Sequence, residues 1–186
     1  MLNRRKFHAL SVALASSMIA VGGLARPASA IAGAGQTVTF RDGTVVSALG
    51  QGSWHLAQGR HSEAAEQEAL RTGIALGMTL IDTAEAYSNG HSEELIGRVI
   101  AGQRDHVFVV SKVLPAHVKG DGIAHACAAS LARLGTDHLD LYLLHWRNGI
   151  SDLSDVVTAF ERLRSFSPHR NSTVNSIHGR ADEHRA

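Results

Sequence analysis

Residues 79–87 read Thr-Leu-Ile-Asp-Thr-Ala-Glu-Ala-Tyr, so a short apolar run ends on Asp82 and Tyr87 follows on the next loop. Three other apolar runs end in a comparable way: Val45–Leu49 before Gly50, Val107–Val110 before Ser111 and Lys112, and Leu139–Leu144 before His145 and Trp146. In a parallel β/α array the carboxyl ends of all strands meet on one face, where active sites are built. We therefore expect four side chains to converge there: Asp82, Tyr87, Lys112 and His145.

Helical patterns separate these runs. A serine followed by acidic residues suits the start of a helix, and a Leu-Gly pair suits its left-handed end. These signals predict helices that begin at Ser62, at Ser92, near Gly120 and at Ser154, two of which end at Leu76-Gly77 and Leu134-Gly135. The buried stripe of the first helix is expected to hold Ala65, Ala69, Leu70 and Ile74.

Ahead of the first helix, residues 36–48 predict a β-hairpin that turns at Asp42-Gly43. From there strand and helix patterns alternate four times along the chain. Such alternation predicts the α/β class, with a parallel sheet and helices packed outside it.

The first thirty residues have the pattern of a twin-arginine export signal. Arg4-Arg5 precedes a moderately apolar stretch, Ala9–Ala25, and Ala28-Ser29-Ala30 resembles a cleavage site. The apolar stretch is weak for a spanning helix, which needs about 20 strongly apolar residues. We expect residues 1–30 to be a cleaved signal read by the twin-arginine export machinery, which predicts a periplasmic protein. The alternatives are an uncleaved anchor, or a cytoplasmic protein if the signal is not used.

This segment also determines the sign of the net charge. It holds four of the 18 basic residues and no acidic residue, so residues 31–186 carry 14 basic against 17 acidic residues. The net charge there is −3 instead of +1, which argues against a nucleic-acid partner. The single cysteine, Cys127, excludes an internal disulfide framework and is expected to be a core residue.

The four predicted site residues suit the reduction of a carbonyl group. That reaction needs a hydride, which no side chain supplies, and a proton donor within hydrogen-bond reach of the oxygen. A lysine ammonium beside Tyr87 would favour its phenolate form, and an aspartate would hold the lysine in place. Each residue alone has a structural explanation, because such residues also cap loops, pack or face solvent. Their joint placement favours a catalytic role.

Four motifs in order resemble the aldo-keto reductase family: Gly50–Trp54, Ile81–Glu93, Val110–Lys112 and Leu141–Trp146. The resemblance covers roughly residues 36–164. It implies an eight-stranded β/α barrel of the TIM type, with an N-terminal hairpin closing its bottom. It also implies NADP-dependent reduction of aldehydes or ketones, so the expected cofactor is NADP(H) and the expected partner is a small-molecule carbonyl substrate.

The resemblance also implies a role for each site residue. Tyr87 would be the general acid, and Asp82 and Lys112 the pair that tunes it. His145 would orient the substrate. The cofactor would be contacted by Gly52, Ser53, Trp54 and Asp82, and the substrate by Trp54, His145 and Trp146.

Other sites receive little support from the sequence. The twelve histidines form no zinc-binding motif, and a single cysteine excludes a thiolate zinc site, so no metal is expected. Gly50-Gln51-Gly52 lacks the third glycine of a dinucleotide-binding fingerprint.

The sequence departs from the family after the fourth helix. A closed barrel takes typically about 250 residues. Here Leu163-Arg164-Ser165 runs into residues 166–186, which have no periodicity and are expected to be a disordered or aberrant tail. Residues 31–165 are therefore predicted to form the N-terminal half of a (β/α)8 barrel. The family's remaining cofactor contacts would lie in the other half. A frameshift, a premature stop and a gene-model error all remain open as causes.

Three hypotheses follow. The chain is a reductase of this family, or a catalytically inactive half-barrel that cannot hold its cofactor. The third hypothesis is an assembly module, in which half-barrels associate through their open sheet edges.

The export signal can be tested by changing Arg4 and Arg5 to lysine. We expect the double substitution to trap the protein in the cytoplasm, because the twin-arginine route discriminates between the two residues. Cell fractionation followed by immunoblotting measures the distribution. Unchanged periplasmic accumulation would contradict a twin-arginine signal.

Overall fold

The computed structural model describes residues 35–147 and 149–166. The chain divides into two units, Met1–Ala30 and Ile31–Ala186, and every described residue belongs to the second. The predicted export signal and the chain after Phe166 lie outside the described residues. No helix within the described ranges is long and apolar enough to cross a membrane.

An antiparallel hairpin opens the described chain, as predicted. Strand β1 (Thr37–Thr39) pairs with β2 (Val45–Ser47), and Gly43 takes the left-handed conformation at the turn, with φ of 87°. Ser47 Oγ accepts a hydrogen bond of 2.9 Å from the backbone N–H of Leu80, where β4 begins. The hairpin therefore lies against the amino-terminal side of the sheet, away from the strand ends that carry the predicted site.

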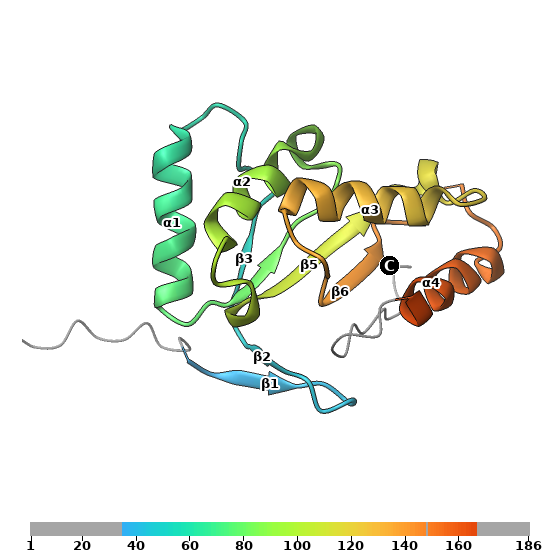
Figure 1. Cartoon of the computed structure of the whole chain (residues 1–186), viewed down its shortest axis with the longest axis horizontal. Coiled ribbons are helices and arrows are strands. Elements are labelled where there is room, and N and C mark those ends of the chain that lie inside the picture. The colour runs from blue at the N-terminus through green and yellow to red at the C-terminus, as the bar shows by residue number, and fades with distance from the viewer. Residues whose placement is uncertain (1–34, 148, 167–186) are drawn as a thin grey trace, which may run out of the picture. The chain divides into compact units, whose positions relative to one another are not determined.

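Four parallel strands in sequential order form the main sheet, β3-β4-β5-β6 (Figure 1). They are β3 (Gly50–Gly52), β4 (Leu80–Asp82), β5 (Phe108–Val113) and β6 (Leu141–Leu144). The prediction of a parallel sheet in this order is confirmed.

The first strand of this sheet differs from the prediction. The apolar run Val45–Leu49 does not form it, because Val45–Ser47 belongs to the hairpin and Gly50–Gly52 is itself the strand. A Cβ at Gly50 would lie only 2.7 Å from Leu80 Cδ2, so glycine permits the close approach of β3 to β4. A Gly-Gln-Gly strand has no apolar periodicity to reveal it.

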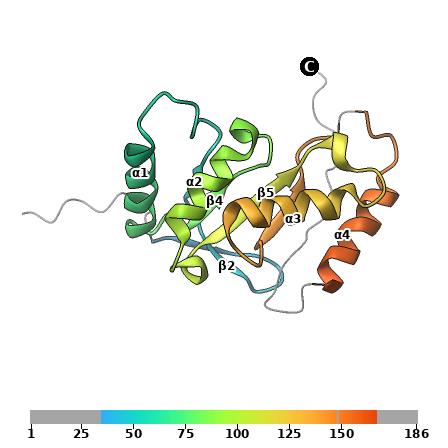
Figure 2. The same ribbon diagram turned by 45° about the horizontal axis from the view of Figure 1, so that its top comes forward.

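The helices alternate with the strands. Their bounds are α1 Glu63–Ala75, α2 His91–Ile100, α3 Gly122–Leu134 and α4 Ser154–Phe166, with short 3₁₀ helices at Tyr87–Gly90 (η2), Arg104–His106 (η3) and Pro115–His117 (η4). Helices α1, α2 and α3 cover one face of the sheet (Figures 1 and 2). Helix α4 packs on β6, where the ring of Phe160 meets that of Tyr142 edge-on.

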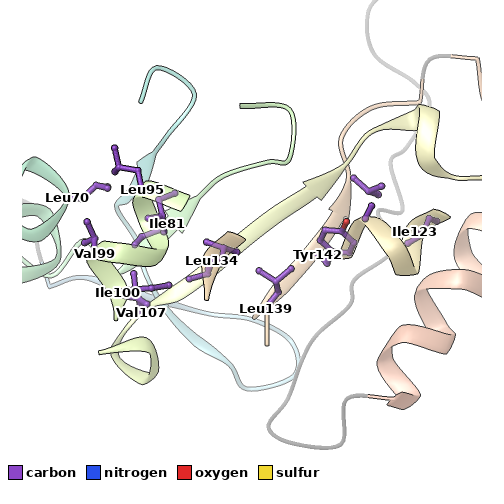
Figure 3. Close-up of a cluster of buried hydrophobic side chains, with 14 of the residues drawn as sticks. Leu70, Ile81, Leu95, Val99, Ile100, Val107, Ile123, Leu134, Leu139 and Tyr142 are labelled. Carbon is purple, nitrogen blue, oxygen red and sulfur yellow. The ribbon is translucent and has the colours of Figure 1, made fainter. Parts of the chain in front are cut away.

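The hydrophobic core fills the space between the sheet and these helices (Figure 3). Every second side chain of β5 enters this core, because successive residues of a strand point to opposite faces. Val109, Ser111 and Val113 are fully buried toward the helices. Lys112, between them, points to the opposite face, which carries the predicted site.

Two local predictions about the helices were wrong. Helix α2 is preceded by Gly90, with φ of 90°, and Ser92 lies inside the helix, where its hydroxyl donates to the carbonyl of Ser53. On α1 the buried residues are Glu66, Leu70 and Gly73, whereas Ala65 and Ala69 are exposed. A Cβ at Gly73 would collide with the side chain of Gln51 on β3, so this contact rotates the buried face away from the alanines.

A buried carboxylate joins three elements behind the sheet. Glu93 of α2 is completely buried, and it accepts hydrogen bonds from Ser111 Oγ at 2.6 Å and from Arg133 Nε at 2.7 Å. Arg133, on α3, also donates to Ser130 Oγ at 3.1 Å. Because Ser111 belongs to β5, Glu93 fixes α2 and α3 to the strand that carries Lys112.

We expect Glu93→Ala to lower the free energy of unfolding by about 2–4 kcal/mol, because it leaves a buried hydroxyl and a guanidinium without their partner. Glu94→Ala is the matched control, since Glu94 follows Glu93 on α2 and is not among the buried residues of that helix. Urea denaturation followed by circular dichroism measures both. Equal, small effects of the two substitutions would contradict the structural role of Glu93.

Candidate active site

The four predicted residues lie at the carboxyl ends of three neighbouring strands. Asp82 is the last residue of β4, Lys112 lies near the end of β5, and His145 directly follows β6. The loop after β4 stays beside β5, because Thr83 N–H donates to the Val110 carbonyl at 2.8 Å. This loop leads to Tyr87, the first residue of η2.

Lys112 is the centre of the site. Its Nζ lies 2.7 Å from Asp82 Oδ1 and donates to the carbonyl of Thr83 at 2.9 Å. The same nitrogen donates to the hydroxyl oxygen of Tyr87 at 3.2 Å. Only 14% of the Lys112 side chain is exposed, against 38% for Asp82. The ammonium is thus held in one place, with its positive charge directed at the tyrosine oxygen.

His145 closes the group from β6. Its ring centroid lies 5.6 Å from that of Tyr87 in an edge-to-face contact. Its backbone N–H donates to the Val113 carbonyl at 2.9 Å, which continues the pairing of β5 with β6. Burial, and then the nearby charge of Lys112, lower the pKa of His145 below its ordinary value of 6.5. A neutral imidazole therefore faces the tyrosine at pH 7.

Of the three residues at the end of β3, Gly52, Ser53 and Trp54, one is enclosed and two are exposed. Ser53 is fully buried, its N–H donates to the Asp82 carbonyl at 3.0 Å, and its hydroxyl has no partner among the described residues. Gly52 is exposed, and a Cβ there would meet nothing within 4 Å. Trp54 is 64% exposed and stacks on His55 at 4.7 Å. Of these three residues, Gly52 and Trp54 thus offer surface to a ligand.

Trp146 lies beside the central group. Its ring centroid is 4.1 Å from that of His145, and its side chain is partly exposed. The structure therefore brings together Asp82, Tyr87, Lys112, His145 and Trp146. Trp54 follows β3, on the other side of β4, and its ring stacks on His55.

Glu85 is a residue of the site that the sequence analysis missed. Its carboxylate is 8% exposed and accepts hydrogen bonds from Leu114 N–H at 2.6 Å and from His117 Nδ1 at 2.9 Å. These contacts fix the loop after β5 to the loop that carries Tyr87. The available signal was a carboxylate between Asp82 and Tyr87, inside the most specific motif.

Comparison with known proteins identifies the family of this chain. Residues 48–165 match the aldo/keto reductase family. The methylglyoxal reductase YeaE of Escherichia coli is 45% identical over 126 residues, which cover 68% of this chain and 44% of that protein. The aldo-keto reductase YhdN of Bacillus subtilis is 33% identical, over 65% of this chain and 40% of its own length. The chain thus spans less than half the length of these curated relatives.

Solved structures of aldo-keto reductases also match this chain. An aldo/keto reductase from Klebsiella pneumoniae in complex with NADP and acetate matches with a TM-score of 0.66 and 45% identity, over 70% of this chain and 46% of that one. A Bombyx mori aldo-keto reductase in complex with NADP matches with a TM-score of 0.61 and 26% identity, over 71% of this chain and 47% of that one. The prediction of about four βα units of a TIM barrel is confirmed, and the chain belongs to the aldo/keto reductase family.

Proposed function

We propose that this chain carries the proton-donating site of an NADP(H)-dependent reductase that converts aldehyde or ketone carbonyls to alcohols, with Tyr87 as the general acid. One observation supports this most strongly. Lys112 Nζ contacts both the Asp82 carboxylate and the Tyr87 hydroxyl, at 2.7 Å and 3.2 Å. A purely structural ion pair would need only Lys112 and Asp82. The additional contact with the Tyr87 hydroxyl supports a role in proton donation.

The residues act on the carbonyl oxygen. Reduction adds a hydride to the carbonyl carbon, which NADPH supplies when bound. Tyr87 donates its hydroxyl proton to the oxygen, and the Lys112 ammonium stabilises the phenolate that remains. Asp82 keeps the ammonium in place. His145, as a neutral imidazole, donates a hydrogen bond that orients the carbonyl without competing as the acid.

The exposed residues around this group fit the proposed ligands. Gly52 adjoins open space at the end of β3, and Trp54 presents an exposed indole face on which a flat ring can stack. We assign the nicotinamide side to Gly52, Trp54 and Asp82, with Ser53 supporting them from beneath. The substrate side belongs to Trp54, His145 and Trp146. NADP in the related crystal structures supports this choice of cofactor.

A second candidate function is assembly. Within residues 35–147 and 149–166, β3 pairs only with β4, and β6 only with β5. Two such sheets can close one barrel if β6 of each copy pairs with β3 of the other, because all strands are parallel. The chain would then act as an assembly module, or as an inactive half-barrel when alone. Light scattering after size exclusion separates these states, since a closed pair has twice the monomer mass.

We locate the activity in the periplasm, on the strength of the export signal proposed for residues 1–30. The twin-arginine pair and the small-residue site support this assignment. The lysine substitutions described above test it.

The role of Tyr87 is best tested in a completed barrel. We expect a fusion of the C-terminal half of YeaE after Arg164 to reduce aldehydes with NADPH. Tyr87→Phe should lower kcat/KM at least about 100-fold, since general acid catalysis contributes that much. Tyr142→Phe is the matched control, because Tyr142 is the only other tyrosine and faces α4. A fusion that keeps its activity after Tyr87→Phe would contradict the proposed acid.

The state of His145 predicts a pH dependence. The pKa of His145 in the folded state lies below 6.5, its ordinary value. The stability that His145 contributes is therefore fully present above pH 6.5 and is lost as the pH falls from 6.5 through the folded-state pKa. We expect Lys112→Met to raise the pKa toward 6.5 by removing the neighbouring positive charge, while Lys119→Met leaves it unchanged. Titration of the His145 ring protons by NMR measures both. An unchanged pKa in Lys112→Met would show that Lys112 does not act on His145.

A further inference from the structure

Strained backbone gathers in two segments of the site. Among the described residues, the non-glycine residues with positive φ are Ala57 at 57°, Ser88 at 51° and Asn89 at 55°. Ala57 belongs to the segment Ser53–Gln58, which follows β3 and carries Trp54 (the Trp54 segment). The other two belong to η2, which begins with Tyr87. Such strain persists only where surrounding contacts over-determine the conformation. The contacts that these three residues and their neighbours make therefore indicate how the two segments are held in place.

Ser88 connects the two segments directly. Its hydroxyl donates to the Leu56 carbonyl at 2.8 Å, across 32 residues of sequence. Ser88 directly follows Tyr87, and Leu56 lies two residues after Trp54. The bond therefore links the residue next to the proposed acid to the segment that carries the exposed indole.

Glu66 holds the Trp54 segment from the other side. This residue of α1 is only 4% exposed, and its Oε2 accepts a hydrogen bond of 2.8 Å from Ala57 N–H. Its Oε1 is buried without a hydrogen-bond partner among the described residues. A buried carboxylate with one such contact contributes little to stability, and an apolar residue would suit the core better. The hydrogen bond of Glu66 to the strained Ala57 indicates that Glu66 holds the Trp54 segment in place.

We propose that Ser88 and Glu66 are positioning residues that fix the Trp54 segment relative to Tyr87. They act through this segment and do not touch the reacting atoms. The consequence for catalysis rests on the proposed function, since the position of Trp54 would then set the width of the substrate site. The positioning itself can be measured on the full chain without cofactor or turnover.

The hydroxyl of Ser88 is tested by Ser88→Gly, because glycine accepts the positive φ and only the hydrogen bond is lost. Asn89→Gly is the matched control, since it relaxes the same kind of backbone at the next residue. With Trp146→Phe as background, Trp54 is the only tryptophan. We expect the fast part of its fluorescence anisotropy decay to grow about twofold in Ser88→Gly, as side-chain motion on the nanosecond scale increases. The control should keep the parent value.

Glu66 is tested by hydrogen exchange at the Ala57 amide. Glu66→Ala should speed this exchange about tenfold through loss of one charge-assisted hydrogen bond. Glu66→Gln retains a carbonyl acceptor and should restore slow exchange. Glu68→Ala, on the exposed side of α1, is the control and should leave exchange unchanged.

The melting temperature distinguishes positioning from general stability. We expect it to fall by only about 2–8 °C in Ser88→Gly and Glu66→Ala, since each variant loses a single hydrogen bond, while Trp54 motion and Ala57 exchange change clearly. Unchanged motion and exchange in these two variants would overturn the proposal, and so would equal changes in both controls. If the chain reduces no carbonyl but the Trp54 segment loosens as expected, only the proposed function fails.

Discussion

The contacts of Lys112 with the side chains of Asp82 and Tyr87 are the interactions on which the site depends. An ammonium that is largely buried needs a negative partner, and the Asp82 carboxylate at 2.7 Å provides one. The other contact, to Tyr87 at 3.2 Å, places the charge where a phenolate would form. Strand register makes this possible, because Asp82 pairs with Val110 and thus lies beside the strand that carries Lys112.

The two faces of β5 make different contacts. Ser111 points toward the helices and bonds to Glu93, which Arg133 neutralises from α3. Lys112, the next residue, points toward the site. The buried carboxylate therefore fixes the strand on one face, while Lys112 contacts Asp82 and Tyr87 on the other. The hairpin contributes at the opposite end of the sheet, through the bond between Ser47 and Leu80.

The sequence predicted the features that repeat or that end an element. The parallel strand order, the Asp-Gly hairpin and the convergence of Asp82, Tyr87, Lys112 and His145 followed from strand runs that end on reactive residues. It missed the features that depend on contacts distant in sequence. The Gly-Gln-Gly strand β3 has no apolar periodicity. The buried face of helix α1 is set by a contact with Gln51 of that strand, which is distant in sequence. Glu66, Glu85 and Ser92 bond to backbone groups of other loops, which leave no local signal.

The position of Lys112 can be measured directly in a crystal structure of the full chain at high resolution. We expect Nζ to lie within hydrogen-bond distance of Asp82, the Thr83 carbonyl and the Tyr87 hydroxyl, as it does here at 2.7, 2.9 and 3.2 Å. A structure in which Lys112 points to solvent, or in which Tyr87 lies beyond its reach, would contradict the assignment of this site as the centre of proton transfer.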